Sequence, residues 1–154
     1  MKLYLMQHGE AKSKQEDPER ALSDQGRKDV HKMADLISQK GMSVNRIIHS
    51  GKLRAQQTAE IISGKITTAT TEISSCINPN DDLGDFLEEI DNTEDELFVV
   101  GHLPFLSKLV TALVTDRDDL ELVNYQPGSI VCLERDDQER WLLNWMLRPE
   151  LIVA

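Results

Sequence analysis

The chain has 154 residues, enough for one domain that buries roughly 70% of its unfolded surface without a metal or disulfide. Its 17 basic and 27 acidic residues give a formal net charge of −10, which argues against a nucleic-acid backbone as partner. The apolar N-terminal run is too short for a signal peptide or a membrane span, and Cys76 and Cys132 lack redox-motif spacing. We therefore expect a cytoplasmic domain with reduced cysteines and no membrane or nucleic-acid partner.

Apolar runs alternate with helical patterns in the first third of the chain. A strand is predicted from Leu3 up to His8. A helix is predicted to start at a Ser23 cap and to run to about Lys40, with Gly41 as its stop. Its apolar residues recur at helical spacing, namely Val30, Met33, Ala34 and Ile37.

The middle of the chain continues this alternation. A second strand spans 46–48 before His49, and a helix over about 52–63 ends at Gly64. Its sheet-facing residues should be Ala55, Ala59 and Ile62. Residues 66–76, rich in Thr and Ser, favour a short strand, and 85–90 favour a short amphipathic helix.

The last third predicts the remaining strands. Residues 97–101 form an apolar run before His102, and a helix should begin at Pro104. Residues 129–135 and 140–147 resemble two strands joined by a four-residue hairpin loop. The whole pattern predicts a three-layer α/β domain with a mainly parallel sheet and helices on both faces.

Three of the predicted strands stop at a histidine: His8, His49 and His102. In an open parallel sheet, ligands bind in the crevice beyond the carboxyl ends of the strands. The second predicted helix adds Lys52 and Arg54 in its first turn, where acidic residues are normally preferred. Free N–H groups and a guanidinium at that end predict an anion site.

Four motifs follow one another in fixed order: Gln7-His8-Gly9-Glu10-Ala11, Leu22-Ser23-Asp24-Gln25-Gly26, Ser50-Gly51-Lys52-Leu53-Arg54-Ala55-Gln56-Gln57-Thr58 and Gly101-His102-Leu103-Pro104. In order and spacing they resemble the histidine phosphatase superfamily, and most of all its small SixA-type phosphohistidine phosphatases. The resemblance covers essentially the whole chain. It implies a single phosphoglycerate mutase-like domain over residues 1–154.

The resemblance also implies roles for individual residues. His8 matches the nucleophile that becomes phosphorylated, Arg54 a phosphate-binding arginine, and His102 the second histidine of the pocket. Gln7 and Gly9 complete the implied phosphate-binding set. The implied activity is that of a metal-independent phosphatase in signal transduction, without a cofactor, whose substrate is a phosphohistidine-bearing protein or a small phosphorylated compound.

Two positions depart from the family pattern. Members normally carry Arg before the nucleophile, whereas this chain has Gln7, which lacks the charge and the bidentate fork of a guanidinium. Gly51 stands where many members have Pro, which we expect to loosen the turn. The Gln7 departure keeps open a second hypothesis, a catalytically impaired module that binds phosphate or a phosphoprotein.

The chemistry follows from these residues. Neutral His8 attacks phosphorus, Arg54 and His102 stabilise the equatorial oxygens, and water hydrolyses the phosphohistidine. A backbone carbonyl or carboxylate should hold the other nitrogen of His8, and His102, once placed among phosphate oxygens, is expected to serve best as a cation. A phosphohistidine substrate needs no dedicated acid, because its imidazole leaves easily once protonated. The carboxylates of Glu10, Asp81 and Asp82 are the available acids, although a surface role is the commoner explanation for such residues.

Other polar features leave alternatives open. The long polar connection 9–21 is either a mobile surface loop or a source of the charge missing at Gln7, through Lys12, Lys14 or Arg20. His49 is expected to be a rim or packing residue, and His31 to face solvent. A third hypothesis is a zinc site of His8, His49 and His102, although no metal-binding spacing supports it.

Overall fold

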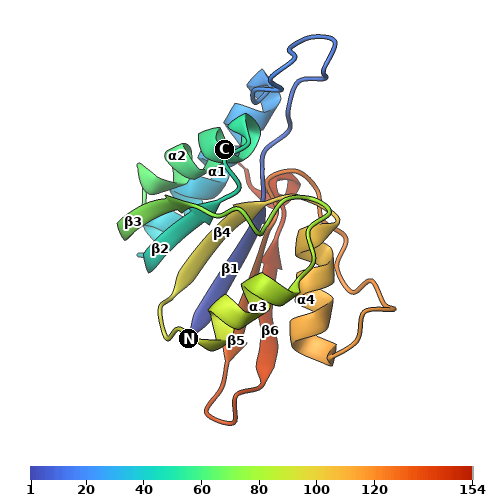
Figure 1. The fold of residues 1–154 in the computed structure, drawn as a ribbon. Coiled ribbons are helices and arrows are strands. Elements are labelled where there is room, and N and C mark those ends of the chain that lie inside the picture. The colour runs from blue at the N-terminus through green and yellow to red at the C-terminus, as the bar shows by residue number, and fades with distance from the viewer. Residues whose placement is uncertain (154) are drawn as a thin grey trace.

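The computed structural model describes residues 1–153 as a six-stranded sheet between two layers of helices (Figure 1). The strands are β1 (Lys2–Gln7), β2 (Ser43–His49), β3 (Thr67–Ile73), β4 (Leu97–Gly101), β5 (Ile130–Arg135) and β6 (Trp141–Leu147). The helices are α1 (Asp24–Gln39), α2 (Leu53–Ser63), α3 (Gly84–Asp91), α4 (Phe105–Thr115) and a short 3-10 helix, η1 (Pro149–Leu151).

The strand order is β3-β2-β4-β1-β5-β6. The first four of these strands are parallel, whereas β5 and β6 are antiparallel to their neighbours. The predicted mainly parallel sheet with helices on both faces is therefore confirmed. The order also makes β1 and β2 the two neighbours of β4, so that the three histidine-bearing strand ends lie at one edge of the sheet.

Alternation along β1 divides the core in two. Leu3 and Leu5 belong to the cluster that packs under α3 and α4, and Tyr4 and Met6 to the cluster that packs under α1 and α2. All four residues are buried, with exposed fractions of 6% or less. A strand with both faces covered places its last residues at a rigid, dry edge, which suits a site that must hold a side chain in one orientation.

The predicted element ends differ little from those of the structure. Ser23 caps α1 by accepting a hydrogen bond from the Gly26 amide, and Gly41 follows the helix with a left-handed φ of 71°. The helix predicted from Pro104 begins one residue later, at Phe105, with Pro104 as its N-cap. The short helix η1 was not predicted, because three residues are too few to show a period.

No helix within residues 1–153 combines the length and the apolar character that a membrane span requires.

Candidate active site

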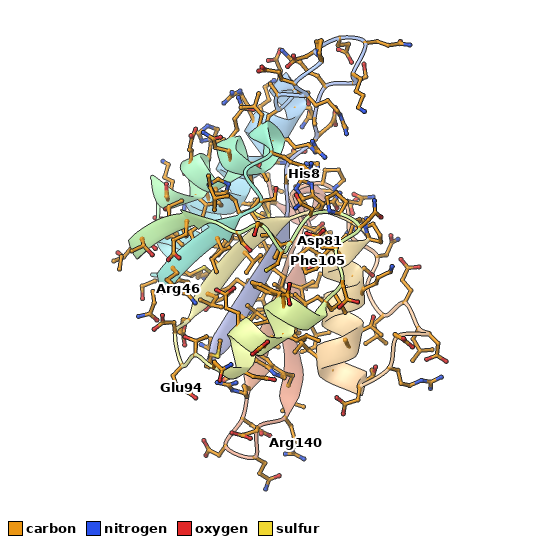
Figure 2. All side chains as sticks on the ribbon, viewed as in Figure 1. His8, Arg46, Asp81, Glu94, Phe105 and Arg140 are labelled. Atoms are coloured by element: carbon orange, nitrogen blue, oxygen red, sulfur yellow. The ribbon has the colours of Figure 1, made fainter. Side chains whose placement is uncertain are left out.

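Three neighbouring strand ends and the start of α2 form the candidate site. His8 follows β1, His102 follows β4, and Ser50 follows β2 at the turn into α2. Figure 2 shows His8 at the upper end of the sheet, and Arg140 of the β5–β6 turn at the opposite end. The sheet thus places the predicted histidine pair at the carboxyl ends of its parallel strands, as the sequence indicates.

His8 is held by its own backbone. Its Nδ1 lies 2.7 Å from the carbonyl oxygen of Gly9, so Nδ1–H donates and Nε2 is left with the free lone pair. Burial lowers the pKa of His8 to about 4; the Gly9 hydrogen bond opposes this shift, and the charges of Arg54 and Arg20 add to it. The imidazole is therefore neutral at pH 7 and presents one nucleophilic nitrogen.

His102 lies against His8, with 5.1 Å between the ring centroids and an interplanar angle of 53°. Its Nε2 is 2.6 Å from the hydroxyl of Ser50, and its buried Nδ1 has no hydrogen-bond partner in residues 1–153. Burial first, and then the charges of His8, Arg54, Lys52 and Arg20, lower the pKa of His102 to about 3. His102 is therefore neutral in the free protein, and a cationic His102 among phosphate oxygens stays a prediction.

Arg54 lies in the first turn of α2, which has no acidic residue and no side-chain cap. Its Nε is buried without a partner, and no carboxylate of residues 1–153 forms an ion pair with it. Burial, and then the charge of Arg20, lower the pKa of Arg54. A guanidinium beside a positive helix end, without an anion, fits the predicted anion site.

Thr58, the last residue of the third motif, connects β1 to α2, a role that the sequence does not reveal. Its Oγ1 accepts from the Gly9 amide at 3.1 Å and donates to the Arg54 carbonyl oxygen at 2.8 Å. The Gly9 peptide therefore holds His8 with its carbonyl and α2 with its N–H. That N–H is not free for an anion in this structure, in contrast to the phosphate-binding role expected of Gly9.

Gln7 is buried, with 9% of its surface exposed, and its Oε1 has no hydrogen-bond partner in the described chain. The backbone of Gln7 is fully engaged: its N–H donates to the Ser129 carbonyl oxygen and its carbonyl accepts from the Gly128 amide. The side chain is the last of β1 before His8. A buried amide oxygen without a partner is costly unless a ligand or water satisfies it.

The β2–α2 turn uses Gly51 for a purpose that proline cannot serve. Gly51 has a φ of 85°, and its N–H donates to Nδ1 of His49 at 3.1 Å. Proline has a fixed negative φ and no N–H, so the turn is of a different type rather than a looser one. His49 is buried in this turn, in agreement with the predicted packing role, and His31 is exposed.

The structure does not support the alternative of a zinc site at His8, His49 and His102. Residues 1–153 contain no group of three histidine, cysteine or acidic side chains that could share one metal ion. His49 uses its Nδ1 within its own turn.

The three carboxylates named as acids are all engaged locally. Glu10 accepts from the Ser23 hydroxyl at 3.1 Å, Asp81 from the Asn78 amide at 2.8 Å and Asp82 from the Gly84 amide at 2.7 Å. Figure 2 shows Asp81 on the segment between β3 and α3, which crosses the same end of the sheet as His8. These bonds favour turn-stabilising roles over that of a proton donor.

Comparison with known proteins places this geometry in context. The profile of the histidine phosphatase superfamily (branch 1) matches residues 3–76. An uncharacterised protein of Picosynechococcus sp. is 31% identical over 164 residues, covering 96% of this chain and 99% of that protein. The phosphohistidine phosphatase SixA of Escherichia coli is 24% identical over 155 residues, covering 97% of this chain and 94% of SixA.

A solved structure shares the fold. The structure of the protein histidine phosphatase SixA complexed with tungstate superposes with a TM-score of 0.83 at 24% identity, covering 97% of each chain. The predicted phosphoglycerate mutase-like architecture is therefore confirmed.

Proposed function

Because the chain belongs to the histidine phosphatase superfamily, we propose that it is a metal-independent phosphohistidine phosphatase that works through a phosphorylated His8. The observation that carries the proposal is the hydrogen bond from Nδ1 of His8 to the Gly9 carbonyl oxygen, at 2.7 Å. It fixes the tautomer in which Nε2 is a nucleophile, and the low pKa of about 4 keeps that nitrogen unprotonated.

In the first step, the lone pair of His8 Nε2 forms a bond to phosphorus while the P–N bond of the substrate breaks. The departing imidazole, already protonated on its other ring nitrogen, keeps the electron pair of the broken bond and leaves as a neutral ring. His8 then carries phosphate on Nε2 and a proton on Nδ1, and the Gly9 carbonyl stabilises the resulting positive charge. In the second step, water attacks phosphorus, the P–Nε2 bond breaks, and the electron pair returns to His8.

Arg54 and His102 are assigned to the phosphoryl oxygens. This assignment is supported by Nε of Arg54 and Nδ1 of His102, which are buried and have no hydrogen-bond partner in residues 1–153. Such groups bind an anion without first releasing another partner. Burial first, and then nearby positive charges, hold the pKa of His102 near 3, and an incoming dianion opposes both effects by favouring the protonated ring. His102 can then take up a proton on binding and serve as the expected cation.

The phosphohistidine substrate is supported by the local engagement of Glu10, Asp81 and Asp82. An alkoxide leaving group needs a positioned acid, whereas an imidazole does not. The partner is therefore proposed to be a phosphohistidine-bearing protein, or a small compound with an equally good leaving group.

The test is turnover of a phosphohistidine-bearing protein and of p-nitrophenyl phosphate, with and without EDTA. We expect EDTA-resistant hydrolysis of the first substrate in preference to the second. His8→Ala should abolish turnover with the fold retained, since the residue lies beyond the end of β1, and the exposed His31→Ala is the matched control. Unaltered activity in His8→Ala would rule out His8 as nucleophile.

The second hypothesis, an impaired binding module, makes a different prediction. Such a protein would bind tungstate at the same place and release no phosphate from either substrate. Loss of activity on chelation and recovery with zinc would instead favour a metal enzyme.

A further inference from the structure

We propose that Arg20, from the connection between β1 and α1, is a second phosphate-binding guanidinium that supplies the charge absent at Gln7. The inference rests on the proposed function and adds a residue to the same site. Arg20 lies in the connection 9–21, whose backbone is ordered although several of its side chains are exposed. The sequence alone does not separate these two properties.

The connection between β1 and α1 is ordered by backbone and side-chain hydrogen bonds. A β-bridge joins Ala11 to Leu22, and the Lys12 amide donates to the Ala21 carbonyl oxygen at 2.8 Å. Asp17 organises the turn, because its carboxylate accepts from the amides of Glu19 at 3.1 Å and Ala21 at 2.9 Å. Leu22 is tied to α2, since its amide donates to the side chain of Gln57 at 2.8 Å. The backbone around Arg20 therefore has a defined position next to α2.

Arg20 itself has an unusual backbone and a directed side chain. It adopts a left-handed φ of 54°, which is uncommon for a residue with a Cβ and often marks a functional position. The side chain is half-buried, and its Nε donates to the Lys12 carbonyl oxygen at 3.0 Å. That bond orients the guanidinium while its two terminal nitrogens make no hydrogen bond within residues 1–153.

Arg20 also differs from most other arginines in having no carboxylate partner. Of the eight arginines, five form ion pairs: Arg46, Arg117, Arg135, Arg140 and Arg148. The three that form none within residues 1–153 are Arg20, Arg27 and Arg54, and of these Arg27 is exposed on α1. In a chain of net charge −10, two half-buried, unpaired guanidiniums indicate an anion that is brought by a ligand.

The charge of Arg20 acts on the same groups as the charge of Arg54. It lowers the pKa of His8, of His102 and of Arg54 itself, whereas the charges of Lys12 and Lys14 are not among the causes of these shifts. Cations that oppose one another in this way store unfavourable energy that a phosphoryl dianion relieves on binding. The charge of Arg20, rather than that of Lys12 or Lys14, therefore reaches the site, and the bond to the Lys12 carbonyl oxygen orients the guanidinium that carries it.

The experiment is calorimetric titration of tungstate into wild type, R20Q, R20K, Q7R and the double variant Q7R/R20Q. K14Q is the matched control, because Lys14 is an exposed cation of the same connection. We expect R20Q to weaken binding about tenfold or more, as for loss of a charged hydrogen bond, and K14Q to change it less than twofold. R20K should retain part of the affinity, and Q7R should restore affinity to R20Q by returning a cation to the phosphate.

Equal affinities of R20Q and K14Q would overturn the inference. A loss in R20Q that neither R20K nor Q7R restores would also overturn it, since Arg20 would then only support the loop. Failure of the proposed function is a separate result. If the wild type hydrolyses phosphohistidine and R20Q binds tungstate like K14Q, only the role of Arg20 is refuted. If the wild type is inactive, the proposed phosphatase activity is refuted.

Discussion

At the scale of single residues, burial of two imidazoles determines how the protein should respond to acid. The pKa of His8 is lowered to about 4, so His8 loses its nucleophilic lone pair only when the pH falls through about 4. We predict that kcat/KM is level from pH 8 to about 5 and falls below that, measured in buffers of constant ionic strength. An acid limb centred near 6.5, the ordinary histidine value, would contradict a buried neutral His8.

The same shifts set the direction of acid unfolding. In the unfolded chain both histidines take up protons below about pH 6.5, whereas folded His8 and His102 remain neutral until about 4 and 3. The unfolded state thus binds more protons in this window, and the free energy of unfolding falls as pH drops from about 6.5 towards 4. Tungstate, which favours the protonated pocket, should reduce that loss.

The residues that the sequence could identify are those with a local signal. His8 and His102 end apolar runs and Arg54 violates the charge preference of a helix start, so each is visible within a few positions. Ser50 and Thr58 show no such pattern, because their hydrogen bonds reach His102 and Gly9, 52 and 49 positions away. Their roles appear only when the strands are placed side by side.

At the scale of elements, the backbone of α1 closely approaches the segment after β1 at Gly26. A Cβ on Gly26 would lie 2.1 Å from the carbonyl oxygen of Glu10, and that carbonyl accepts a hydrogen bond from the Ser23 amide at 2.9 Å. Glycine is required here because backbone packs on backbone, and neither side can move without displacing the residues next to His8. Gly26, which directly follows the Ser23-Asp24-Gln25 start of the helix, is thus coupled to the site.

We predict that Gly26→Ala lowers the free energy of unfolding by about 2 kcal/mol or more and reduces turnover, measured by urea denaturation and phosphatase assay. The matched control is Gly64→Ala at the end of α2, where φ is −75° and a Cβ would meet nothing closer than 3.5 Å. The control should change stability by about 1 kcal/mol or less. Equal effects of the two substitutions would mean that α1 can shift freely.

Periodicity explains why the elements were predictable and the turns were not. The apolar residues expected to face the sheet from α1 and α2 are all buried, because tertiary packing and local pattern agree there. The β2–α2 turn was misread, since the positive φ of Gly51 and its bond to His49 depend on backbone geometry that composition does not encode. For the same reason, the sequence does not show whether the connection before α1 is ordered, because its order comes from hydrogen bonds to the side chains of Asp17 and Gln57.

At the scale of the whole molecule, the sheet has two open edges of opposite character. The β3 edge reads Thr-Thr-Ala-Thr-Thr-Glu-Ile and is mostly polar, whereas β6 exposes Leu142, Leu143 and Trp145 at 49%, 47% and 37%. An exposed apolar edge strand offers another chain both unpaired backbone N–H and C=O groups and an apolar surface to pack against. The net charge of −10 opposes such contacts between copies, because every molecule repels its neighbour.

These two features together predict how self-association depends on salt. Screening shortens the range of repulsion to about 8 Å at physiological ionic strength, so added salt should promote association through β6. We predict that Leu143→Lys suppresses this salt-promoted association, followed by light scattering at fixed protein concentration, while turnover is unchanged because β6 lies away from His8. Ala69→Lys, which adds the same charge on the exposed β3 edge, is the control and should leave association as in wild type. Each added Lys changes the net charge from −10 to −9, which weakens the repulsion between copies equally in both variants. If Leu143→Lys associates as readily as Ala69→Lys, the β6 edge does not govern association, and the apolar strand is protected by its own twist and by the bulge where β5 and β6 shift register after Cys132.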